Sequence, residues 1–153
     1  MRCSKNVCLV VAAVAVASVA VLWATPAVYA HCQIPCGIYG DRMRVATLYE
    51  HITTIEKSMN QIMAISKEKD HNANQLVRWV MNKEDHANQL QHIVTQYFMT
   101  QRIKLDAKGY DRKLGLLHQM LVYAMKCKQT TDLGNTTKLT AAINEFKTLY
   151  FTK

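Results

Sequence analysis

The chain has 153 residues, of which 50% are hydrophobic and 20% charged, and its 19 basic and 11 acidic side chains give a net charge of +8. This length suits one domain with one core. The lysines are scattered and no motif of the usual nucleic-acid-binding modules is present, so we expect no nucleic-acid partner.

Residues 1–30 are predicted to be a cleaved signal or leader peptide. Two basic residues and no acidic ones precede an almost unbroken apolar run over residues 7–23, and small residues then lead to Ala30. This order is typical of a secretory signal. We therefore expect a leader-processing peptidase to cut between Ala30 and His31, exporting the mature chain to a periplasm, a lumen or the extracellular space. An apolar run of this length also suits an uncleaved membrane anchor.

Residues 31–40, HCQIPCGIYG, follow the expected cut and form a candidate metal-binding hook. Cleavage would give His31 a free α-amine beside its imidazole. Cys32 would add a backbone nitrogen and a thiolate, and Cys36 a second thiolate. Two nitrogens and two sulfurs in one plane favour nickel(II) or copper(II), whereas zinc prefers a tetrahedron. Because the uncut chain lacks the amine, processing and metal binding would be coupled.

The simpler interpretation of the two hook cysteines is a disulfide. An oxidising compartment would allow a bond between Cys32 and Cys36, with Cys127 left over. An odd number of cysteines in the mature chain does not suit a disulfide framework.

Beyond residue 40, apolar residues recur at spacings of three and four, which predicts amphipathic helices. They are expected over residues 41–63, from 76 to near 104, 114–125 and 139–150. Asp41 is a reasonable N-cap for the first of them. Four helices with short connections predict an all-α, up-and-down four-helix bundle over residues 41–153, with the hook outside it.

The stretch from His31 to Tyr39 resembles the nickel hook of nickel-dependent superoxide dismutases, whose pattern is H-C-x-x-P-C-G-x-Y. All six fixed positions match. The resemblance implies a four-helix bundle that assembles as a homohexamer with one nickel ion per subunit. It also implies the reaction 2 O2•− + 2 H+ → O2 + H2O2, in which nickel cycles between Ni(III) and Ni(II).

The resemblance further implies a role for each hook residue. His31 would bind nickel through its amine and imidazole, Cys32 through its backbone nitrogen and thiolate, and Cys36 through its thiolate. Tyr39 would be the catalytic residue that positions superoxide or water, although an aromatic residue that packs at the start of the first helix is an equal interpretation. The family's leader is usually a pro-segment, in which case the protein would be cytoplasmic.

A binding protein is the alternative to an enzyme. An exported helical bundle with an N-terminal amine, histidine and cysteine chelate would capture nickel or copper for transport or storage. Pro35, Gly37 and Tyr39 favour the enzyme, because capture needs only the chelate whereas redox turnover needs a shaped open face.

The support behind His31 is where this sequence departs from the family. Family members can place a glutamate of the first helix and an arginine of the second behind the histidine ring. Here Glu50 and Glu56 both lie in the first helix, and the stretch 83–86 contains no arginine. The other histidines are expected to be surface or partly buried helical residues, and Cys127 a small buried apolar residue.

Overall fold

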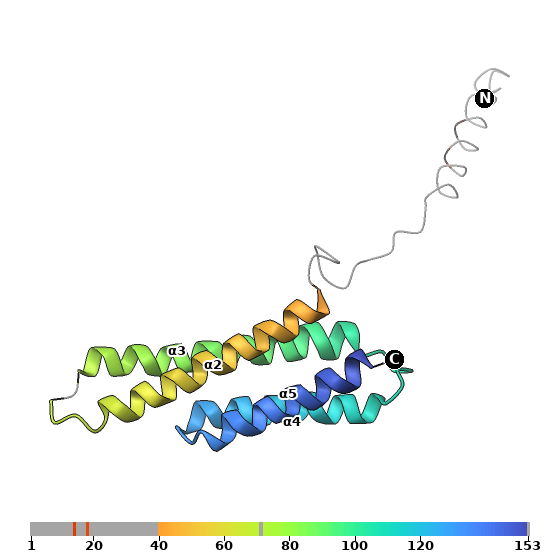
Figure 1. The fold of residues 1–153 in the computed structure, drawn as a ribbon. Helices are drawn as coiled ribbons and strands as arrows, with labels where there is room; N and C mark the ends of the chain where they lie inside the picture. The colour runs from red at the N-terminus through yellow and green to blue at the C-terminus, as the bar shows by residue number, and fades with distance from the viewer. Residues whose placement is uncertain (1–13, 15–17, 19–39, 71, 153) are drawn as a thin grey trace, which may run out of the picture. The chain divides into compact units, whose positions relative to one another are not determined.

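The computed structural model describes residues 40–152 except residue 71, together with Val14 and Ser18. Residues 40–152 lie in one compact unit. Their regular structure is entirely helical (Figure 1). The elements are α2 (Asp41–Ile65), α3 (Ala73–His92), its continuation η1 (Ile93–Arg102), α4 (Tyr110–Gln129) and α5 (Gly134–Phe151).

The helices form the predicted four-helix bundle. Successive helices pack against each other, and contacts between α2 and α5 close the ring. Their connections are short, which makes sequence neighbours antiparallel. Figure 1 shows α2 beside α3 and α4 beside α5. No helix of the described residues has both the length and the apolar character needed to span a membrane.

The core follows the apolar spacing of the sequence. Leu48 and Ile55 of α2 are fully buried, as the period of three and four predicts. Phe98 of η1 meets Phe146 of α5 edge to face, with ring centroids 5.1 Å apart. Burial of each such side chain stabilises the fold by about 1.5–3 kcal/mol. The core thus fixes η1 against α5.

The second helix changes its hydrogen-bond register half-way along, which the sequence analysis did not predict. From Ile93 to Arg102 the chain forms a π-helix, in which each amide bonds the carbonyl five residues earlier. The register continues to the end of the helix, where the Ile103 amide donates to the Phe98 carbonyl at 3.0 Å. The wider turn determines which side chains of η1 share a face.

The expected capping role of Asp41 is wrong. Gly40 is the N-cap residue of α2, and no side chain caps the helix there. Asp41 is instead the first helical residue, and its carboxylate accepts hydrogen bonds from the neighbouring helices. Donors from those helices thus take up the oxygens that capping would have used.

Candidate metal centre

The predicted ligands His31, Cys32 and Cys36, and the predicted catalytic residue Tyr39, lie outside the described residues. The continuous described part of the chain begins at Gly40, one residue after Tyr39. What the structure does describe is therefore the start of α2 and the side chains that hold it.

The start of α2 is held by a cluster of four side chains, here called the Asp41 cluster: Asp41, Tyr97, Arg102 and Tyr150. The Tyr97 hydroxyl donates to Asp41 Oδ1 at 2.6 Å, and Arg102 Nε donates to the same oxygen at 2.9 Å. The Tyr150 hydroxyl donates to Asp41 Oδ2 at 2.9 Å. Arg102 Nη2 also donates to the Tyr97 hydroxyl oxygen at 3.0 Å. Both carboxylate oxygens are thus satisfied.

The protonation states of the cluster follow from its burial. Burial, followed by the hydrogen bond to Asp41, raises the pKa of Tyr97 and also that of Tyr150. Both phenols therefore stay neutral hydrogen-bond donors at neutral pH. The hydrogen bond to Tyr97 is the main cause that raises the pKa of Arg102. The Arg102 guanidinium also lies over the Tyr97 ring, 4.7 Å from its centroid, in a cation–π arrangement.

A pair of histidines joins α2 to α3 farther along the bundle. His51 Nδ1 and His86 Nδ1 are 2.9 Å apart, and the two rings meet edge to face. One nitrogen must donate and the other accept, so the contact needs one proton between them. His51 is buried, with 7% of its surface exposed, and so lies deeper than the surface or partly buried position expected for it.

We expect the histidine pair to make the fold sensitive to acid. Burial lowers the pKa of His51, the neighbouring His86 lowers it further, and Glu50 opposes the shift. The unfolded chain therefore binds a proton more readily than the folded chain below about pH 6.5. Stability should then fall as the pH drops through that value, because protons favour the state that binds them.

Chemical denaturation at about pH 7.5 and about pH 5 checks this expectation. Replacing His51 by glutamine should reduce the loss of unfolding free energy between the two pH values. His118→Gln is the matched control, since His118 is exposed on α4, and it should keep the wild-type loss. A His51→Gln protein with the full wild-type loss would contradict the assignment.

Two residues of the stretch 83–86, where the sequence offers no arginine to support His31, are engaged with other helices of the bundle. Lys83 is buried and donates to the carbonyl of Lys128, in the last turn of α4, at 2.5 Å and to that of Thr130, just after the helix, at 3.4 Å. His86 contacts His51. Within the described residues, no three histidine, cysteine, aspartate or glutamate side chains gather as a metal site.

A family model decides the identity. The model of the nickel-containing superoxide dismutases matches residues 26–153. The chain belongs to this family. No curated protein and no solved structure matches significantly. This nickel-containing superoxide dismutase is an oxidoreductase, with superoxide as the substrate and nickel as the cofactor that the family implies.

The donor chemistry of the hook fits that cofactor. A free amine, a backbone nitrogen, an imidazole and two thiolates are the nitrogen and sulfur donors that His31, Cys32 and Cys36 would offer. Such donors suit nickel(II) better than hard cations, which prefer oxygen. The match includes all of these residues, because it begins five positions before His31.

Cys127 of the dismutase is a buried thiol, as predicted. It is fully inaccessible in the core, and burial raises its pKa to about 11. A thiol is a poor metal ligand and nucleophile until it loses its proton. Cys127 is therefore a packing residue at neutral pH.

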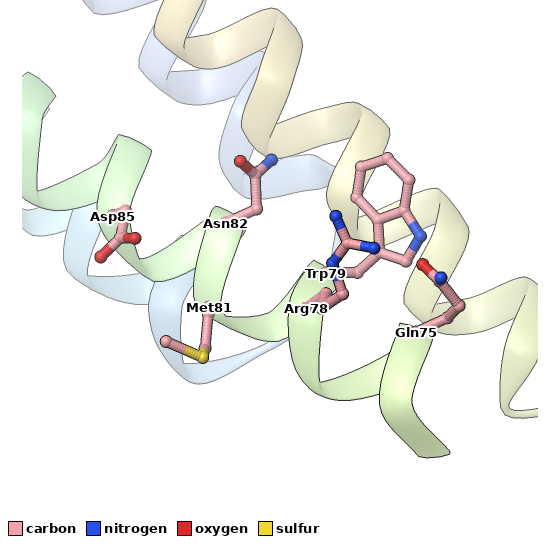
Figure 2. Close-up of a pocket in the computed structure, with 6 residues that line it drawn as sticks. All are labelled: Gln75, Arg78, Trp79, Met81, Asn82 and Asp85. Atoms are coloured by element: carbon pink, nitrogen blue, oxygen red, sulfur yellow. The ribbon is translucent and has the colours of Figure 1, made fainter. Parts of the chain in front are cut away.

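A surface depression of the described bundle lies on α3, and Figure 2 shows its lining. The lining residues are Gln75, Arg78, Trp79, Met81, Asn82 and Asp85. All of them come from this one helix, and Asp85 is the one carboxylate among them. Lys57 of α2 lies over the Trp79 ring, 6.0 Å from its centroid. With one carboxylate and a lining from a single helix, this depression lacks the set of ligands that a metal ion needs.

Proposed function

We propose that the mature chain begins at His31 and disproportionates superoxide with nickel held by the hook. The family match over residues 26–153 supports this proposal, because it includes the nine-residue stretch in which all six fixed hook positions are present. Membership of an enzyme family also favours catalysis over the alternative of a nickel- or copper-binding protein.

Each hook residue then has a role. His31 binds nickel through its amine and imidazole, Cys32 through its backbone nitrogen and thiolate, and Cys36 through its thiolate, at one nickel per subunit. When bound, nickel supplies a Ni(II)/Ni(III) couple that takes an electron from one superoxide and gives it to another. Tyr39 holds superoxide or water with its hydroxyl. The mature chain carries 17 basic and 11 acidic side chains, and this excess attracts the anionic substrate.

The processing and assembly of the chain are part of the proposal. Residues 1–30 act as the leader, 31–40 as the hook and 41–153 as the bundle. A peptidase removes the leader between Ala30 and His31, and the enzyme works outside the cytoplasm. Six copies assemble as a homohexamer.

Intact mass, nickel content and superoxide dismutation of the protein purified from its native host test the proposal together. The expected result is a chain that begins at His31, carries about one nickel ion and disproportionates superoxide. A chain that keeps residues 1–30 would contradict it. So would a mature chain with a Cys32–Cys36 disulfide and no metal.

A further inference from the structure

The Asp41 cluster lies where the chain enters the bundle. Asp41 is the first residue of α2, and Cys36 precedes it by five residues. Five residues of chain span at most about 18 Å, so the first turn of α2 limits the space that Cys36 can reach. Gly40 has no side chain with which to hold that turn. Within this turn, Asp41 accepts hydrogen bonds from two other helices, while Arg42 and Arg44 lie over the rings of Phe151 and Tyr97.

Those contacts tie the turn to two other helix ends. Tyr97 and Arg102 are 56 and 61 residues away in sequence and come from η1, whereas Tyr150 is 109 residues away and comes from α5. Two donors hold Oδ1 and a third holds Oδ2. The carboxylate therefore cannot rotate without breaking bonds to one of the two neighbours.

The π-helical register brings two of these donors together. Tyr97 and Arg102 are five residues apart, and in an α-helix side chains three and four apart share a face. In η1 the side chains of Thr100 and Gln101 donate to carbonyls five residues earlier, at 2.8 and 2.7 Å. π-Helical segments are rare in proteins, but those that occur often lie at functional sites. The wide turn thus allows one helix end to supply two donors to one carboxylate.

We propose that Asp41, Arg102 and Tyr150 are positioning residues for the nickel hook. By fixing the first turn of α2, they fix the base from which Cys36 reaches the metal. This inference rests on the proposed function. It predicts that weakening the cluster loosens nickel while the bundle remains folded.

Asp41→Asn and Tyr150→Phe in the processed, nickel-loaded enzyme test the inference. Asparagine loses the charge, and phenylalanine removes one donor while keeping the ring that stacks on Phe146. We expect both variants to release nickel into excess chelator at least about 10-fold faster than the wild type, the size typical for residues that orient ligands. The thiolate-to-nickel absorption band should also change.

Two control variants separate positioning from general loss of stability. Glu145→Gln removes an exposed ion pair with Arg112. Leu139→Ala opens a cavity in the core of α5, eleven residues before Tyr150 and so about 16 Å along the helix. Both controls should release nickel at the wild-type rate with an unchanged absorption band, although Leu139→Ala should lower Tm.

Circular dichroism and Tm of every variant complete the experiment. If Leu139→Ala speeds nickel release as much as Tyr150→Phe does, general instability explains the effect and the inference is overturned. If the wild type carries nickel but both Asp41→Asn and Tyr150→Phe release it at the wild-type rate with an unchanged absorption band, this inference alone is overturned. A wild type without nickel would overturn the proposed function and this inference with it.

Discussion

Cys32→Ser is expected to remove nickel and to lower superoxide dismutation by more than roughly 100-fold, since even residues that only orient a ligand contribute 10–100-fold. The metal ligand is the thiolate, and a serine hydroxyl does not ionise near neutral pH. The variant also loses the sulfur whose electrons would stabilise oxidised nickel. Elemental analysis gives the nickel content, and stopped-flow decay of superoxide gives the rate.

Cys127→Ala is the matched control for this variant. It also removes one thiol, but from the buried core and at a site whose raised pKa keeps sulfur protonated. It should keep nickel and activity at a cost of about 1 kcal/mol in unfolding free energy. A Cys32→Ser enzyme with full nickel and activity would show that its sulfur is not a ligand.

One extra glycine before His31 is expected to have an effect of similar size. The added residue converts the α-amine of His31 into a peptide nitrogen, which binds a metal only after losing its proton. We expect a loss of nickel and a fall in activity by more than roughly 100-fold, although no side chain has changed. Loading the extended chain with nickel and assaying it as above measures both.

The control for the extended chain is the same preparation after enzymatic removal of the glycine. Nickel binding and activity should both return, because removing the glycine returns the free α-amine to His31 and changes nothing else. Equal nickel content and activity before and after removal would exclude the amine as a ligand. The leader would then serve as a targeting signal, and its removal would not be needed to form the nickel site.

The bundle could be predicted because the apolar spacing that marks each helix lies within a short stretch of sequence. Leu48 and Ile55 repeat at helical spacing, and such a stripe indicates a buried face wherever it occurs. The π-helix could not be predicted in this way. Over ten residues, a shift of each hydrogen bond by one position changes the apolar pattern too little to be read from Val94, Tyr97 and Phe98.

The same contrast applies to the candidate site. The hook was visible because its proposed ligands lie within the six residues from His31 to Cys36. The Asp41 cluster joins residues up to 109 apart in sequence, and His51 meets His86 across 35 residues. Nothing in the neighbourhood of Asp41 indicates that two tyrosines and an arginine will reach it. Only the packing of η1 and α5 against α2 creates that arrangement.

The burial of Cys127 has a consequence for the working life of an enzyme that makes hydrogen peroxide. Peroxide oxidises thiolates, and a core thiol with a pKa of about 11 gives it almost none to attack. If the hook holds nickel as proposed, its thiolates would lie beside the site where superoxide reacts, without the burial that protects Cys127. Oxidation by peroxide should therefore accumulate at the cysteines near the N-terminus. An enzyme inactivated in this way would keep its helical bundle folded.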